Sequence, residues 1–324
     1  MIARRHLALA AALPLLARPA RAQGQAWPNR TIRLIVPWPP GQATDLVGRI
    51  MAQHLSQKLG QQMVPENKPG AGGSIGTDFV AKAAPDGYTL LAASIGPISF
   101  GPLLQRLPYD VERDLAPIAT FSGSPYFLVV RGDSPAQDAR GLIDLLKREP
   151  GKRSYASSGV GGAQHLLTAL LVARTEVDVL HVPFQGSGPA MAALLGGQVD
   201  FAIETLAAAA GLIREGKLRA LGSTVGRRTE LMPEVPPLAE ALNLPGYDYI
   251  GWIGMMAPAA TPRPILDRLS NELAEASTLP ETRQRLATIG TESLPRNPDE
   301  FRTLLAQQRE AFGAVIRSLG IRPE

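Results

Sequence analysis

Four loops of this 324-residue chain combine glycine, serine and proline where a predicted strand gives way to a predicted helix. Such a loop leaves backbone N–H groups and hydroxyls free at the positive end of the helix, where they bind a carboxylate or another anion. The loops hold few charged side chains, which favours recognition of a small acid by backbone dipoles. Glycine and serine are also common in ordinary turns, so one such loop alone would indicate little. The candidate ligand-binding residues are Trp38, Pro40, Gly41, Gln42, Thr44, Asp45, Ser94, Ile95, Gly96, Ser157, Ser158, Gly159, Gly161, Gly162, Phe184, Gln185, Gly186 and Ser187.

Two acids stand at junctions of the same kind. Asp45 and Glu204 each follow a predicted strand and could accept a donor group of the ligand. An acid at this place also caps the start of a helix, and the sequence leaves both roles open. Trp38 is held at the mouth of its loop by Pro39-Pro40 and is expected to contact the ligand, whereas Phe184 is expected to face the core more than the ligand.

The loop from Ser157 to Gly162 carries the most specific expectation. Its Ser-Ser-Gly-x-Gly-Gly composition lets the backbone approach a ligand closely. We expect its N–H groups and the hydroxyl of Ser158 to hold a carboxylate.

Motifs for catalysis are weaker. The segment Gly72 to Gly76 matches G-x-S-x-G, the nucleophile elbow of α/β hydrolases, and His165 or His181 with Asp178 could complete a triad. An elbow requires a strand that runs directly into Ser74, and the preceding residues are not of that kind. A dinucleotide fingerprint fails on spacing. The histidines share no metal-binding spacing, so the sequence predicts no cofactor and no metal site.

The first 22 residues have the pattern of a secretory signal peptide, with Arg4-Arg5, an apolar run from Leu7 to Ala17 and an A-x-A site ending at Ala22. This leader carries four of the 33 basic residues and no acid, which leaves 29 basic against 29 acidic residues. A nucleic-acid or anionic-membrane partner is therefore disfavoured. The chain has no cysteine, which excludes disulfides and thiol catalysis. We expect a soluble, exported protein, by the general rather than the twin-arginine route.

Strand-like and helix-like runs alternate over most of the remaining chain, which predicts an α/β fold with mostly parallel sheets covered by helices on both faces. The first helix is predicted over Thr44–Leu59, with Thr44 as its N-cap and Gly60 beyond its end. Predicted strands are Thr31–Pro37, Tyr88–Ala93, Tyr126–Arg131, Ser154–Ser157, Val177–Val182, Val199–Ile203, Leu218–Thr224 and Tyr247–Met256, and the later helices are 139–149, 162–174, 188–196, 205–215, 263–277, 280–289 and 298–318.

A series of short sequence motifs, one after another, extends over nearly the whole chain after the leader. They are Ile32 to Pro37, Pro39-Pro40-Gly41, Thr44-Asp45, Glu66 to Gly73, Ala84 to Leu90, Leu107 to Asp110, Tyr155 to Gly159, His181 to Phe184, Leu194 to Asp200, Gly216 to Leu221 and Ala257 to Pro262. Together these motifs resemble the Bug family, the extracytoplasmic solute receptors of tripartite tricarboxylate transporters.

The resemblance implies a type II periplasmic-binding-protein fold with a ligand cleft between two lobes. The predicted lobes are 23–123 with 225–324, and 124–224, with crossings near Ser122–Tyr126 and Ser223–Gly226. It implies a periplasmic, non-enzymatic receptor that acts as a monomer, binds a small carboxylate-containing solute and passes it to a membrane permease. It also adds Glu204 and Thr205 to the second-lobe site.

The chain departs from the family pattern at Gln42-Ala43, at Phe184-Gln185, at Glu204 and at Gly162. These departures leave the backbone grip on a carboxylate in place, but they leave open what the rest of the ligand is. Two other functions also stay open: an exported serine hydrolase that uses Ser74, and a ligand sensor that signals to a membrane kinase.

Overall fold

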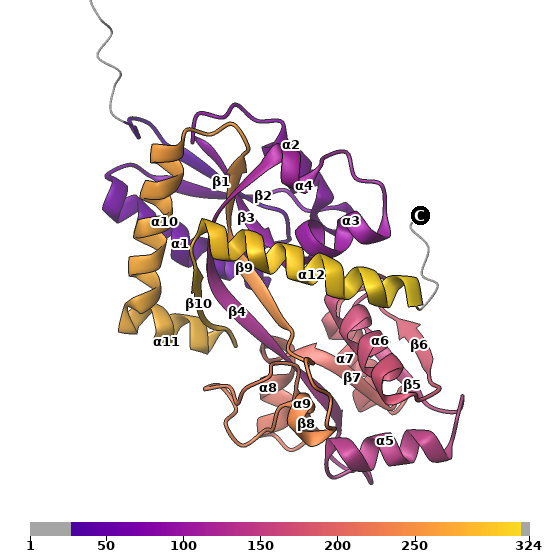
Figure 1. Cartoon of the computed structure of the whole chain (residues 1–324). Coiled ribbons are helices and arrows are strands. Elements are labelled where there is room, and N and C mark those ends of the chain that lie inside the picture. Colours follow the sequence, from indigo (N-terminus) through magenta and orange to yellow (C-terminus); the bar gives the residue numbers. More distant parts are fainter. Residues whose placement is uncertain (1–26, 319–324) are drawn as a thin grey trace, which may run out of the picture.

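The computed structural model describes residues 27–318 (Figure 1). The predicted signal peptide, residues 1–22, lies outside the described residues. Within them, no helix has both the length and the apolar character to cross a membrane. Strands and helices alternate as predicted: β1 (Ile32–Val36), α1 (Ala43–Leu59), β2 (Met63–Asn67), α2 (Ser74–Ala81), β3 (Thr89–Ser94), η2 (Gly96–Phe100), α3 (Gly101–Leu104), α4 (Val111–Asp114), β4 (Leu115–Arg131), α5 (Ala139–Arg148), β5 (Ser154–Ser157), α6 (Ala163–Thr175), β6 (Leu180–Pro183), α7 (Ser187–Leu195), β7 (Phe201–Thr205), α8 (Leu206–Arg214), β8 (Leu218–Ser223), α9 (Leu238–Ala241), β9 (Ile250–Pro258), α10 (Arg263–Thr278), α11 (Pro280–Thr288), β10 (Glu292–Arg296) and α12 (Pro298–Ser318).

The strands form two sheets that share β4, in the order β2-β1-β3-β9-β4-β7-β5-β6, with β8 and β10 also paired to β4. Strands β1, β2 and β3 are parallel, and so are β5, β6 and β7. Both sheets are mixed rather than mostly parallel, because β4 and β9 run antiparallel to every neighbour. The predicted α/β, two-lobed fold is confirmed.

A single long strand joins the two sheets. The first part of β4, up to Pro125, pairs with β9, and its second part, from Tyr126, pairs with β7 and β8. On the return, Ser223 and Pro237 bridge beside the second sheet, and the chain pairs with the first sheet again at Ile250. The exact limits of the two lobes stay a prediction.

Helix α1 shows how the first sheet is covered. Its apolar residues Val47, Ile50, Met51 and Leu55 are buried in the cluster that also holds β1 and β3. Gly60 ends the helix with a φ of 68°, as glycine does most easily. The predicted N-cap is wrong by two residues, since Gln42 holds this place and Thr44 lies inside the helix.

The last helix, α12, lies across both lobes and passes in front of β4 and β9 in the view of Figure 1. It contacts β4, β10 and η2 of the first part of the fold and α6 of the second. Its Gln308 is buried and accepts hydrogen bonds from the Ser99 hydroxyl (2.8 Å) and from Nε1 of Trp252 on β9 (2.9 Å). Helix α12 therefore covers the face of β4 and β9 on which the Trp252 side chain lies.

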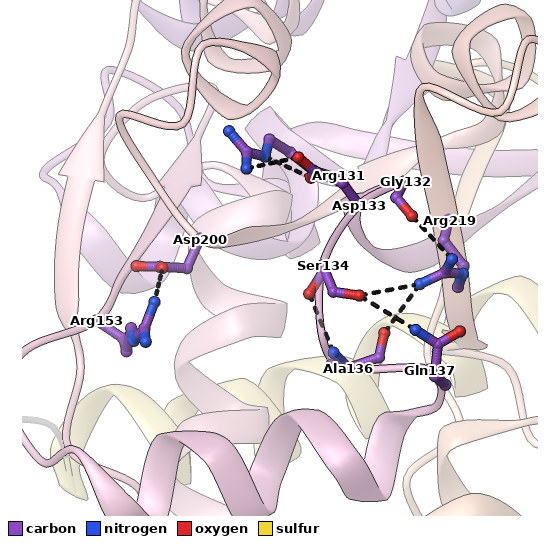
Figure 2. Close-up of polar contacts among 9 residues, drawn as sticks. All are labelled: Arg131, Gly132, Asp133, Ser134, Ala136, Gln137, Arg153, Asp200 and Arg219. Atoms are coloured by element: carbon purple, nitrogen blue, oxygen red, sulfur yellow. Dashed lines mark hydrogen bonds and ion pairs between the residues drawn. The ribbon is translucent and has the colours of Figure 1, made fainter.

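Charged side chains gather at the edge of the second sheet where β5 and β7 begin (Figure 2). Arg153 pairs with Asp200, and Arg131 pairs with Asp133, each at 2.9 Å. Arg219 donates to the carbonyls of Gly132, Ser134 and Ala136 and fixes the turn after β4. The opposite edge, where these parallel strands end, is the one that carries the predicted ligand loops.

Candidate functional site

The first-lobe loops come together at the ends of β1 and β3. The indole Nε1 of Trp38 donates to the hydroxyl of Ser94 at 2.8 Å, and a Cβ on Gly96 would lie 3.3 Å from the Trp38 ring. Ser94 and Ile95 are buried, whereas Pro40, Gly41 and Gln42 are exposed at the tip. Trp38 therefore joins the two predicted loops into one surface.

Asp45 positions the first of these loops. Its carboxylate accepts hydrogen bonds from the Gly41 N–H, from Asn67 Nδ2 and from two nitrogens of Arg49, at 2.9–3.0 Å. Burial would raise the pKa of Asp45, but these hydrogen bonds, together with the Arg49 charge, outweigh it and hold the pKa below the ordinary value. Asn67 Nδ2 also donates to the Trp38 carbonyl. All these contacts lie within the protein, so Asp45 organises the loop, and the Gly41 N–H is not free.

The second-lobe loops are linked by Gln164, near the start of α6. Its Oε1 accepts from the Ser158 hydroxyl at 2.7 Å, and its Nε2 donates to Glu204 Oε1 at 3.0 Å and to Ser187 Oγ at 3.3 Å. Glu204 Oε1 also accepts from the N–H and the hydroxyl of Thr205. One network thus connects the ends of β5 and β7 with the start of α7. Because Ser158 already donates its proton to Gln164, its hydroxyl can offer only lone pairs to a ligand, which corrects the expectation that it holds a carboxylate.

Two stacked histidines contact the loop that follows β5. The rings of His165 and His181 are 4.0 Å apart and inclined by 5°, and Tyr155 stacks on the other side of His181. His165 Nδ1 accepts the Gly161 N–H at 3.0 Å, and His181 Nε2 lies 2.7 Å from Ser157 Oγ. Burial, with a smaller effect of His181, lowers the pKa of His165 to about 4. The Gly161 N–H is therefore held by His165, which corrects the expectation that it faces a ligand.

Four helices begin at predicted site residues without a side-chain cap. The N-caps of α1, α6, α7 and α8 are Gln42, Gly162, Gly186 and Thr205, and none of their side chains bonds to the helix start. The N–H groups of these first turns have no side-chain partner to neutralise them. Residues 27–318 contain no group of three or more acids or histidines placed to hold a metal ion. The edge offers helix N-termini and hydroxyls instead.

The two halves of the site approach each other at Gly161. A Cβ on this glycine would lie 2.6 Å from Leu104 Cδ1, on α3 of the first lobe. Phe184 packs against the hydrophobic cluster of the second lobe, as expected, and Gln185 is exposed. The predicted residues therefore form two groups, one on each lobe, that meet beside Leu104.

The sequence model of the tripartite tricarboxylate transporter family receptors matches residues 47–321 of this chain. The chain belongs to this family. It is 37% identical to Protein BugT of Bordetella pertussis over 93% of each chain. The receptor is a solute-binding protein and not an enzyme.

Solved structures show the same fold. The periplasmic binding protein BugD is 33% identical, with a TM-score of 0.77, over 92% of this receptor and 100% of BugD. An R. palustris protein solved with adipate is 30% identical, with a TM-score of 0.81, over 92% and 100% of the two chains. MatC of Rhodopseudomonas palustris, with bound malate, is 32% identical, with a TM-score of 0.76, over 90% and 100%.

The geometry around Ser74 agrees with a binding role. Ser74 is buried at the start of α2, and a short 3₁₀ turn, η1 (Ala71–Gly73), precedes it in place of the strand that an elbow needs. Gly76 is required for packing, since a Cβ there would lie 2.7 Å from the Lys68 carbonyl oxygen. The G-x-S-x-G pattern of the receptor therefore reflects close packing of α2 and not a nucleophile.

The residues that hold the receptor's loops in place were not predicted from the sequence. Arg49 is four residues after Asp45, a spacing at which an ion pair on a helix is expected. Gln164 and His165 follow Gly162 in the first turn of α6. Asn67 and His181 could not be assigned from spacing, because only the pairing of β1 with β2 and of β5 with β6 brings them to the site.

Glu204 should make the stability of the receptor depend on pH. Burial raises its pKa above the ordinary 4.5, although the bonds from Thr205, Gln164 and Ser187 oppose this. The folded state then binds more protons than the unfolded chain, so stability falls as pH rises above about 4.5. In Glu204→Gln, the amide oxygen can accept the same bonds without ionising. We expect the variant to lose this part of the pH dependence of Tm between acid and neutral pH; equal slopes would exclude the effect.

Proposed function

We propose that this receptor captures a small carboxylate-containing solute between its lobes in the periplasm and delivers it to a membrane permease of the tripartite tricarboxylate type. The observation that carries the proposal is the set of four uncapped helix N-termini, at Gln42, Gly162, Gly186 and Thr205. Such N-termini attract a carboxylate through free N–H groups and the helix dipole. The adipate and malate bound to the two relatives support the same ligand class.

The charges of the site favour binding of the carboxylate by backbone dipoles. None of the twenty predicted site residues is basic. Arg49, the nearest cation to the first loop in the contacts described above, is already paired with Asp45. Glu204 is buried, and burial raises its pKa above the ordinary value. We therefore assign the carboxylate to the helix N-termini.

We further propose that the protein is exported by its leader, residues 1–22, and that its lobes close about β4 and β9. The lobes are proposed as 27–125 with 250–318 and as 126–249, which follows the strand pairing and moves the first limit from the predicted 123 and the second from the predicted 224. Two crossing strands permit a hinge rotation of one lobe against the other. Closure would bring the two groups of loops onto the ligand.

A thermal-shift screen of the mature protein against small carboxylic acids tests the proposal. An acid present at 100 times its Kd should add about 2.7 kcal/mol to the free energy of unfolding and raise Tm. The primary amide of each active acid is the matched control, because it keeps the shape and removes the charge. We expect the acids and not the amides to raise Tm. A folded protein with no response to a broad panel would refute the proposed function.

A further inference from the structure

Strand β4 carries an unexplained row of hydroxyls where it passes between the lobes. Ser122 is 0% exposed and Ser124 is 7% exposed, and the Oγ of each has no hydrogen-bond partner among the described residues. Tyr126, two residues further, is also buried, and its hydroxyl lies next to Gly251. Buried polar groups in proteins nearly always have a hydrogen-bond partner. The two unpaired serine hydroxyls on β4 therefore require an explanation.

Strand register places the first of these serines beside the first-lobe site. Ile253 of β9 lies opposite Ser94 of β3 and also opposite Ser122 of β4. Directly opposite residues in antiparallel strands have their side chains on the same face of the sheet. Ser122 therefore shares a face with Ser94, the residue that receives the hydrogen bond from Trp38.

The other end of the row lies beside the second-lobe site. Ser124 is opposite Gly251, and a Cβ on Gly251 would lie 2.8 Å from the ring of Tyr126 and 3.3 Å from its hydroxyl. Ser124 and Tyr126 thus lie on one face, next to a position that has no side chain. Tyr126 is opposite Thr205, the N-cap of α8. The row of hydroxyls on β4 therefore lies between Ser94 in the first-lobe group and Thr205 in the second-lobe group.

The terminal helix covers the opposite face of these strands. Trp252 is opposite Gly123 and donates to Gln308 of α12. Successive residues of a strand point to opposite faces, so Ser124 and Gly251 face away from this contact. The hydroxyl row is consequently on the side of the loops and not on the side that α12 closes.

We propose that Ser122, Ser124 and Tyr126 form the floor of the ligand site and donate hydrogen bonds to a second oxygen-bearing group of the solute. The inference rests on the proposed function, in which the helix N-termini hold the first carboxylate. Hydroxyls are uncharged donors, so the second group is a hydroxyl, carbonyl or carboxylate oxygen. Unbranched acids with such a group at the far end should bind more tightly than acids that end in a methyl group.

Calorimetric titration with three matched series tests the assignment. The probes are monocarboxylates, ω-hydroxy acids and dicarboxylates of increasing chain length. The variants are Ser124→Ala and Tyr126→Phe, and the control is Thr120→Val, which removes a hydroxyl of the same strand that already donates to the Leu294 carbonyl. We expect each variant to lose about tenfold in affinity for acids with a second oxygen group and to bind monocarboxylates as the parent does.

The melting temperature without ligand gives a second readout. Ser124→Ala should leave Tm unchanged or raise it, because it removes an unpaired buried hydroxyl. Thr120→Val should lower Tm and leave affinity unchanged. If the parent binds and the variants keep its affinities, or if the parent prefers monocarboxylates, the floor assignment alone is wrong. If the parent binds none of the acids, the proposed function fails first and this inference fails with it.

Discussion

Replacing Gly161 by valine should reduce ligand affinity by about a hundredfold and lower the free energy of unfolding by about 2 kcal/mol. Gly161 has a φ of 75°, which strains a β-branched residue. A Cβ there would also lie 2.6 Å from Leu104 Cδ1, so the new side chain pushes against the first lobe. The backbone strain lowers stability, and the valine side chain, pressed against Leu104, opposes closure of the lobes.

Two companion variants separate these causes. Leu104→Ala in the Gly161→Val background removes the clash, and we expect it to restore part of the affinity without restoring stability. Gly216→Ala is the control for strain alone, because Gly216 has a φ of 68° and no atom within 4 Å of a Cβ. It should cost stability and leave binding unchanged. The affinity of each variant is measured by titration with an acid from the screen, and its stability by thermal melting. Unchanged affinity in Gly161→Val would show that the contact between Gly161 and Leu104 does not belong to the site.

Protonation of His165 should cost the protein about 3 kcal/mol of stability on acidification. Its pKa is about 4 in the folded protein and 6.5 in the unfolded chain, because the ring is buried against His181. The unfolded chain binds more protons between these values, so the stabilisation is complete above pH 6.5 and is lost as pH falls towards 4. A proton on Nδ1 would also break the bond from the Gly161 N–H and disturb the loop.

His165→Asn tests this effect, since its Oδ1 can accept the same N–H without titrating. We expect a less stable protein at neutral pH but a much smaller loss of stability between pH 6.5 and 4, measured by chemical denaturation. His54 also has a pKa lowered by burial. It is present in both proteins, so its contribution cancels in the comparison. An equal loss in parent and variant would show that His165 is not the group responsible.

His165 and Glu204 act in opposite directions. The lowered pKa of His165 favours the folded state at higher pH, and the raised pKa of Glu204 favours it at lower pH. Both contact the same group of loops, through Gly161 and Gln164. The two effects offset each other in mildly acidic solution, so single variants at these positions should reveal pH dependences that the parent partly conceals.

Most helices and strands could be predicted because their apolar spacing is regular and glycine or proline marks their ends. The exceptions have physical causes. Residues 115–125 of β4 contain Pro117, Gly123 and Pro125, which usually disfavour strands, yet these residues pair with β9 across two irregularities in register. Strands β2 and β10 are short and partly polar, with Pro65 and Pro295 inside them. Pairing with neighbours, and not local preference, forms these strands.

The places of the predicted loops at junctions between strands and helices were also predictable from composition, and their role in binding stays a prediction. The direction of individual groups was not predictable. Asp45 faces Arg49 and Asn67, Ser158 faces Gln164, and the Gly161 N–H faces His165. Each of these contacts depends on where separate strands and helices are placed, and a single sequence does not contain that information.

The place of β9 between β3 and β4 determines when the chain can fold during synthesis. Strands β3 and β4 are successive in the chain but are not neighbours in the sheet, because Ile250–Pro258 lies between them. The first sheet therefore stays divided until the ribosome has made the C-terminal quarter, whereas β4 to β8 are complete by Ser223. Such long-range pairing slows folding. In the proposed export route, the delay leaves the first lobe unfolded for longer, which helps this part of the polypeptide to pass through a narrow translocation channel.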